Sequence, residues 1–125
     1  MKKEINTKHA PKAIGPYSQG MATEQVLFIS GQLPINPKTG EMPEDVAAQT
    51  KQSLSNLKAI LEQDGLTMSD VVKTTIFVKD IEEFAVVNEV YGEFFVEPFP
   101  ARSTIEVARL PKDAKVEIEA IVTRN

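Results

Sequence analysis

Apolar positions recur every three or four residues in two stretches of the chain. The first predicts a helix of about five turns with one apolar stripe, formed by Val46, Thr50, Leu54, Leu57 and Leu61. Pro43 suits its first turn, and Gly65 stands just past its end, where a left-handed cap is favoured. The second helix is capped by Asp80 and must end before Pro98. Its stripe is Ile81, Phe84, Val87, Tyr91 and Phe95.

Two runs of apolar and β-branched residues predict buried strands. Val26–Ser30 is apolar and stops at Gly31, and Val71–Val78 contains Val, Thr, Ile and Phe with almost no helix formers. We interpret the second run as a central strand. Residues 34–40 are dense in turn formers and predict a loop between the first run and the first helix.

Two later segments alternate with a period of two, which is typical of strands. In 102–107, Arg102 and Thr104 share one face, and in 115–122, Glu117 lies on the face opposite to a row of apolar residues. If these strands are neighbours, their polar faces would present Arg102 and Glu117 together.

The elements follow one another as strands, a helix, a strand, a second helix and strands over residues 1–125. This order predicts an α+β fold of one domain, with two helices packed on one face of one sheet. The other face of such a sheet must be solvated or covered by another copy of the chain.

Composition narrows the classes of function. The chain has 125 residues, a net charge of −4, no cysteine and one histidine, His9. These counts exclude disulfides and thiolate or multi-histidine metal sites, and the acidic balance argues against a nucleic-acid partner. Fully apolar runs reach only four residues, as in Val26–Ile29, which is far too short for a membrane span, and no secretory signal is visible. We therefore expect a cytoplasmic protein with no metal, nucleic-acid or membrane partner.

Arg102 and Glu117 are the foremost candidates for chemistry. An arginine that follows the stiff segment Phe99–Ala101 can hold a substrate carboxylate with two parallel hydrogen bonds, or it can form a plain ion pair. A glutamate on an outward strand face can activate a water as a general base, or it can simply be solvated beside Glu119.

Four further residues are candidates for lining a ligand site. Tyr17 lies in a turn constrained by Gly15–Pro16 and either contacts a ligand or packs on the edge of the core. Gly31 permits close approach of a ligand or another backbone, whereas Ser30 has no base placed for it and is more typical of a turn. Asn88 interrupts an apolar stripe, where it can bind a ligand, a partner chain or a backbone group.

Several segments together resemble the Rid family, the reactive-intermediate (imine and enamine) deaminases also called the YjgF-type family. The resemblance covers nearly the whole chain. Its segments, several of them close to family signatures, are Ala13–Gln19, Ser30–Pro34, Gln52–Leu57, Val72–Val78, Pro100–Ser103, Glu106–Asp113 and Val116–Glu119.

This resemblance implies a chorismate-mutase-like α+β fold with one mixed sheet, assembled as a homotrimeric barrel with sites in the clefts between subunits. It implies hydrolysis of 2-enamino and 2-imino acids, such as 2-aminoacrylate and 2-aminocrotonate, to 2-keto acids and ammonia. The substrates would come from pyridoxal-phosphate enzymes such as serine or threonine dehydratases. The protein itself would use no cofactor.

The family pattern places the carboxylate-binding arginine at Arg102 and the water-activating glutamate at Glu117. It places pocket residues at Tyr17, Ser30 and Asn88. Many relatives carry a cysteine where this chain has Thr104. We expect only the backbone carbonyl of that residue to matter, because the hydrolysis needs a base and a clamp rather than a thiol.

Two other functions stay open at this point. The same pocket can sense a 2-keto acid, so that the protein regulates other enzymes or transcription without catalysis. A ribonuclease or translation-inhibitor role, associated with some relatives, fits poorly with the acidic charge and the missing pair of histidines.

Overall fold

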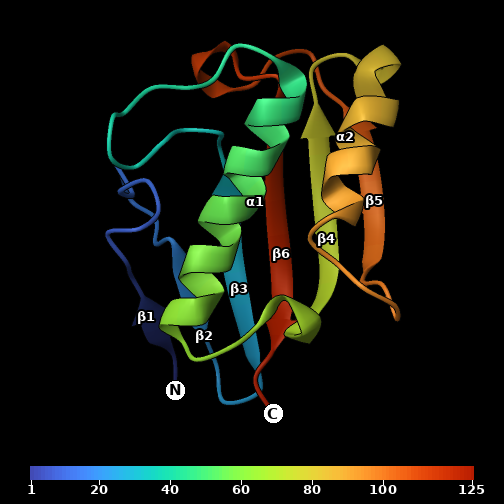
Figure 1. Ribbon diagram of the computed structural model, residues 1–125. Helices are drawn as coiled ribbons and strands as arrows, with labels where there is room; N and C mark the ends of the chain where they lie inside the picture. The colour runs from blue at the N-terminus through green and yellow to red at the C-terminus, as the bar shows by residue number, and fades with distance from the viewer.

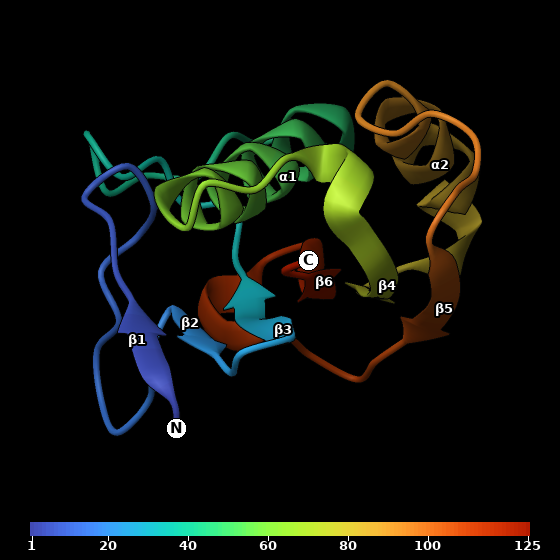
Figure 2. The same cartoon turned by 90° about the horizontal axis from the view of Figure 1, so that it is seen from below.

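In the computed structural model, which describes residues 1–125, two helices pack on one face of a six-stranded sheet (Figures 1 and 2). The strands are β1 Lys3–Ile5, β2 Gly20–Ala22, β3 Val26–Gln32, β4 Val71–Val78, β5 Ala101–Glu106 and β6 Val116–Thr123. The helices are α1 Val46–Gln63 and α2 Phe84–Gly92, and the short 3-10 helices are η1 Met68–Asp70, η2 Ile81–Glu83 and η3 Pro111–Asp113. The predicted α+β architecture is confirmed.

The sheet is mixed, with the order β1-β2-β3-β6-β4-β5. β5 runs parallel to β4, whereas all other neighbouring strands are antiparallel. β4 is an interior strand, as predicted, and β5 is an edge strand joined to β4 through α2. β1 and β2 were not predicted, because three residues are too few to show an alternation.

Helix α1 follows its sequence signals closely. Asp45 caps its first turn by accepting a hydrogen bond from the Ala48 N–H at 3.0 Å, while Pro43 lies before the helix rather than inside its first turn. The helix ends in a Schellman motif, with Gly65 at a φ of 76° and the Leu66 N–H donating to the Leu61 carbonyl at 3.0 Å. The predicted stripe is buried against the sheet at Val46, Thr50, Leu54, Leu57 and Leu61.

Helix α2 is shorter than predicted. Asp80 caps the preceding η2 turn by accepting from the Glu82 N–H at 2.9 Å, and the helix ends at Gly92. Phe95 therefore lies beyond the helix, although it is buried against Tyr91 with the ring centroids 4.5 Å apart. Neither helix has the length and apolar character needed to cross a membrane.

Arg102 on β5 and Glu117 on β6 point to opposite faces of the sheet, whereas the sequence suggested a shared face. Arg102 pairs with Thr74 of β4, which pairs in turn with Ala120 of β6, and the last two residues are buried beneath the helices. Glu117 pairs with Phe77 and lies on the opposite, open face. β4 also separates β5 from β6. The sequence favoured a shared polar face only if the two strands were neighbours; they are not, so Arg102 and Glu117 do not share a face within the chain.

Both helices lie on one side of the sheet, and neither α1 nor α2 covers the other side (Figure 2). We call this other side the open face, and it carries exposed apolar side chains. Phe28 on β3 is 49% exposed and Ile105 on β5 is 47% exposed. Phe77 and Ile121 lie between them on this face and are partly buried. A face of this composition favours contact with another protein surface.

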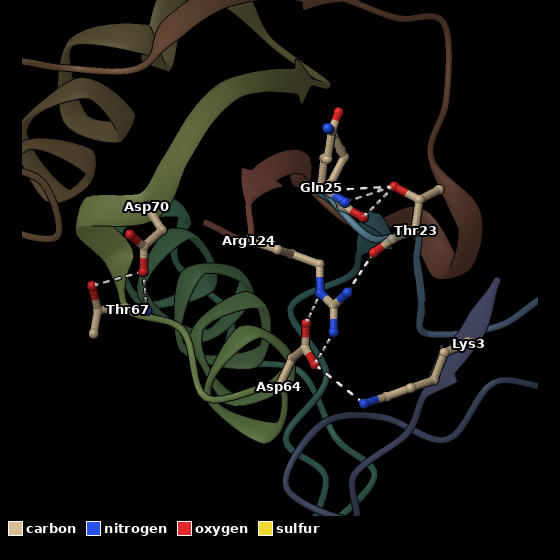
Figure 3. A network of polar contacts seen from close by, with 8 residues as sticks. Lys3, Thr23, Gln25, Asp64, Thr67, Asp70 and Arg124 are labelled. Atoms are coloured by element: carbon tan, nitrogen blue, oxygen red, sulfur yellow. Dashed lines mark hydrogen bonds and ion pairs between the residues drawn. The ribbon is translucent and has the colours of Figure 1, made fainter. Parts of the chain in front are cut away.

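An ion-pair cluster ties both ends of the chain to the end of α1 (Figure 3). The nearly buried Asp64 carboxylate accepts hydrogen bonds from Arg124 Nε at 2.6 Å and Nη2 at 3.0 Å, and Lys3 Nζ lies 3.6 Å away. Arg124 also donates to the Thr23 carbonyl. Hydrogen bonding from Arg124 holds the pKa of Asp64 below its ordinary value, although burial opposes this shift.

Asp64→Asn should lower the free energy of unfolding by about 2 kcal/mol, because the Arg124 guanidinium loses its charged acceptor. The folded-state pKa of Asp64 is depressed, so its stabilisation is present above the ordinary carboxyl range and is lost as pH falls through the folded-state pKa. Urea unfolding at neutral and acidic pH measures both effects. Lys3→Ala is the control: its exposed ammonium should contribute less than about 0.5 kcal/mol. Equal stability of Asp64→Asn and wild type at neutral pH would contradict the prediction.

Candidate active site

The predicted site residues form two groups on opposite sides of the sheet. Asn88, Arg102 and Thr104 lie on the side of the helices, on α2 and β5. Tyr17, Ser30, Gly31 and Glu117 gather around the end of β3 and the start of β6. We call the second set the glutamate group.

Arg102 stands on the edge strand with its side chain turned toward α2. Its Nη1 donates to Asn88 Oδ1 at 2.8 Å, and its guanidinium carbon lies 4.9 Å from the ring centroid of Tyr91 and 5.2 Å from that of Phe84. The ion pairs of the chain are centred on Asp64 and Asp113, and none includes Arg102. The guanidinium therefore keeps its charge and most of its donors free for an external anion.

A cavity of about 430 Å³ opens beside this guanidinium. We call it the arginine cavity; it is lined by Asn88, Tyr91, Gly92, Phe99, Pro100 and Arg102. Thr104 follows two residues later on the same face of β5 and is partly buried beside Ile76. The cavity combines apolar walls with one cation and one amide, which suits a small organic acid.

The glutamate group is built around a close approach between Glu117 and the backbone of Gly31. A Cβ added to Gly31 would lie only 1.9 Å from Glu117 Oε2, so this position must be glycine for the carboxylate to lie where it does. The pairing of β3 with β6 is irregular here, between Ile29 and Gln32. The bulge and the missing side chain together let Glu117 fold over the strand.

Ser30 and Tyr17 border the same region. The Ser30 hydroxyl donates to the Ser18 carbonyl at 2.6 Å, which leaves its oxygen lone pairs free to accept. Tyr17 is 53% exposed and lines one cavity of about 450 Å³ with Ser30 and another of about 310 Å³ with Gly31. Tyr17 therefore does not pack in the core, which was the alternative left open by the sequence.

Glu117 has the electrostatics of a general base. Burial raises the pKa of its carboxyl group, and repulsion from Glu119 raises it further. No side chain or backbone group of the chain donates a hydrogen bond to this carboxylate. A carboxylate with a raised pKa accepts a proton more readily near neutral pH than an ordinary one does.

Arg102 and Glu117 do not meet within one chain. Two strand spacings, about 10 Å, separate β5 from β6 across β4, and the two side chains leave opposite faces of the sheet. Each chain therefore carries two separate groups, which we call half-sites: an arginine beside a cavity, and a carboxylate with polar neighbours.

The sequence-based prediction treated Phe84 and Tyr91 as core residues and missed their contact with Arg102. The signal was present, because Phe84, Asn88 and Tyr91 follow the spacing that places residues on one helix face. The spacing alone did not indicate that Arg102 of β5 lies against these three residues.

The fold and the two half-sites define a small α+β protein with an unpaired arginine beside a cavity and a glutamate whose pKa is raised. Residues 7–124 match the family described as Endoribonuclease L-PSP, and the chain belongs to this family, which is that of the YjgF-type proteins. The predicted membership is confirmed.

Individual relatives match over the full length of the chain. The 2-iminobutanoate/2-iminopropanoate deaminase of Escherichia coli (strain K12) is 60% identical, over 99% of each chain. The crystal structure of the YjgF gene product from E. coli has a TM-score of 0.95 at 60% identity and covers 98% of this chain and 99% of its own. That of E. coli TdcF with bound serine has a TM-score of 0.95 at 51% identity, with the same coverage.

Gly31→Ala should displace the Glu117 side chain, because the new methyl group would occupy the position of its carboxylate. Pushed toward solvent, Glu117 should titrate with a lower pKa, nearer to that of an ordinary glutamate. Carboxyl carbon NMR of labelled glutamates over a pH series measures this shift. Gly92→Ala is the matched control, because a Cβ there meets no atom within 4 Å. An unchanged Glu117 pKa in Gly31→Ala would show that the two residues are not in contact.

Proposed function

We propose that this protein hydrolyses reactive 2-enamino and 2-imino acids, such as 2-aminoacrylate and 2-aminocrotonate, to 2-keto acids and ammonia. The observation that carries the proposal is the full-length 60% identity to the E. coli deaminase of 2-iminobutanoate and 2-iminopropanoate. The serine bound to E. coli TdcF is an acid with nitrogen on its α-carbon, like the proposed substrates. A cytoplasmic location, where such labile compounds are released, is part of the same proposal.

The proposed mechanism uses the two half-sites in turn. Arg102 binds the substrate carboxylate and thereby fixes the neighbouring C=N carbon. An enamine first takes a proton on its β-carbon and becomes the protonated imine. Glu117 removes a proton from a water as the water attacks this carbon, which gives a tetrahedral carbinolamine. The proton on Glu117 then passes to nitrogen. As the C–N bond breaks and ammonia leaves, the carbinolamine hydroxyl gives its proton back to Glu117 and its oxygen becomes the carbonyl of the keto acid. Proton transfer of this kind contributes on the order of 10²–10⁴-fold.

The pocket roles predicted from the sequence belong to the same proposal. Tyr17 and Ser30 would bind the substrate from the side of the base, and Gly31 would leave room for Glu117. Asn88 would orient Arg102, and Thr104 would contribute its backbone carbonyl from β5. These assignments rest on the contacts within the arginine cavity and the glutamate group.

We further infer that each site forms between two copies of the chain in a homotrimer. Two observations support this: the half-sites lie on opposite faces of the sheet, and the open face is partly apolar. A cyclic assembly lets the Arg102 side of one copy meet the Glu117 side of the next.

Addition of the protein to threonine dehydratase should accelerate the release of 2-ketobutyrate, because the released enamine is then hydrolysed by an enzyme. Arg102→Ala should abolish this acceleration, and Glu117→Gln should remain folded but be slower by about 10²-fold or more. The wild-type rate should fall as pH drops through the raised pKa of Glu117, since only the carboxylate accepts a proton. A coupled assay of keto acid over a pH series measures all three effects.

Glu119→Gln is the control for this experiment. It removes one cause of the raised pKa of Glu117, so it should move the acidic limb of the rate profile to lower pH while hydrolysis continues. Binding of 2-ketobutyrate without any acceleration would instead identify the protein as a keto-acid-binding regulator.

Co-expression of Arg102→Ala chains with Glu117→Gln chains should restore activity that neither variant has alone. In randomly mixed trimers about a quarter of the interfaces combine an intact Arg102 from one chain with an intact Glu117 from the next. Differently tagged chains and tandem purification isolate the mixed oligomers for assay. The control replaces Glu117→Gln by the double variant, which should restore nothing. Absence of recovery in the mixed oligomers would refute a site shared between copies.

A further inference from the structure

Three residues of α2 surround the guanidinium of Arg102. Phe84, Asn88 and Tyr91 lie at positions i, i+4 and i+7 and therefore on one face of the helix. Two of them present aromatic faces, at 5.2 Å and 4.9 Å from the guanidinium carbon, and the third accepts a hydrogen bond at 2.8 Å. Cations are attracted to aromatic faces at such distances.

None of these three side chains carries a negative charge. Phenylalanine and asparagine have no titratable group, and burial raises the pKa of Tyr91, which keeps its phenol neutral. The arginine is thus held in one place without a counter-ion. Its single hydrogen bond leaves four of about five N–H donors for another acceptor.

Thr74 of the sheet and Phe95, which follows α2, hold the Tyr91 ring in place. The Thr74 hydroxyl, fully buried on β4, lies 2.7 Å from Tyr91 Oη, and Phe95 packs against the same ring with a centroid distance of 4.5 Å. Tyr91 itself is only 5% exposed. Thr74 is also the residue of β4 that pairs with Arg102 of β5. One residue of the sheet therefore fixes the position of both the Tyr91 ring and the Arg102 backbone.

We propose that Phe84, Asn88 and Tyr91 form an uncharged cradle that positions the Arg102 guanidinium for a carboxylate ligand, with Thr74 fixing the Tyr91 ring. This rests on the proposed function, because the ligand is the acid group of the substrate. A carboxylate in the cradle would compete with the substrate for the same donors. Aliphatic residues in place of the two rings would leave the long arginine side chain free to move. The arginine would then lose conformational entropy each time a ligand bound, and the affinity for the ligand would be lower.

Asn88→Asp tests the charge of the cradle. The two side chains have the same shape, so the fold should survive, but a carboxylate would now accept from Arg102 Nη1. We expect KM for the imino acid to rise by about tenfold or more, with kcat within about threefold, because a binding interaction common to ground and transition states is lost. An unchanged KM would overturn the requirement for an uncharged cradle.

Tyr91→Leu tests the aromatic face. We expect KM to rise by about tenfold, and the NMR signal of the Arg102 Nε–H to lose the shift that a nearby ring imposes. Tyr91→Phe keeps the ring but loses the contact with the Thr74 hydroxyl, so it should recover most of the ring shift and leave KM within about threefold of wild type. Val87→Ala is the matched control, since Val87 is a fully buried residue of α2 that does not line the cavity. A similar rise of KM in Val87→Ala, or none in Tyr91→Leu, would overturn the proposal.

Two further variants distinguish failure of the cradle from failure of the proposed function. Phe84→Leu removes the second, less buried ring and replaces Tyr91→Leu if that variant does not fold; its KM should rise by about threefold. Arg102→Ala is assayed in parallel. If it loses activity while the cradle variants keep a wild-type KM, the cradle is refuted and the deaminase proposal stands. If it remains fully active, the role of Arg102 and with it the cradle are refuted, although hydrolysis stands. If the wild-type protein does not accelerate keto-acid release at all, the proposed function itself fails.

Discussion

The parallel pairing of β5 with β4 is the interaction on which the site depends. Its register sets Arg102 beside Thr74 and turns the arginine toward α2. A slip of one residue would turn the arginine to the open face and out of reach of its aromatic contacts. Because β6 keeps its apolar residues under the helices, Glu117 faces the other way. The division of the site into two halves follows from these two registers.

This division has an electrostatic advantage. An arginine and a glutamate that met within one chain would form an ion pair, as Asp64 and Arg124 do, and the pKa of the carboxyl group would fall. The cation would then be neutralised and the base weakened. On opposite faces, Arg102 remains unpaired and Glu117 keeps a raised pKa. Under the proposed mechanism, the two groups would therefore act on the substrate rather than on each other.

Local signals in the sequence were sufficient for α1, β3, β4 and β6, since caps, stripes and alternation act over a few residues. They were insufficient for β5, because alternation separates two faces without indicating which one is buried. The pairing with β4 turns Arg102 toward the helices, where the rings of Phe84 and Tyr91 contact it, and both interactions join segments distant in sequence. Most site residues were already candidates from their local setting, as Asn88 was because it interrupts an apolar stripe, and the family resemblance added the roles expected of them. Their separation into half-sites required the strand order, which no local pattern contains.

The partly exposed open face links the proposed assembly to the proposed chemistry. Glu117 shares this face with Phe77 and Ile105, and its pKa is already raised by the partial burial that one chain provides. A second copy that covered these apolar side chains would remove more water from the carboxylate and raise the pKa further. Assembly would then complete the site in two ways, by bringing an arginine from the neighbouring copy and by strengthening the base. An isolated chain with the same fold would lack both effects.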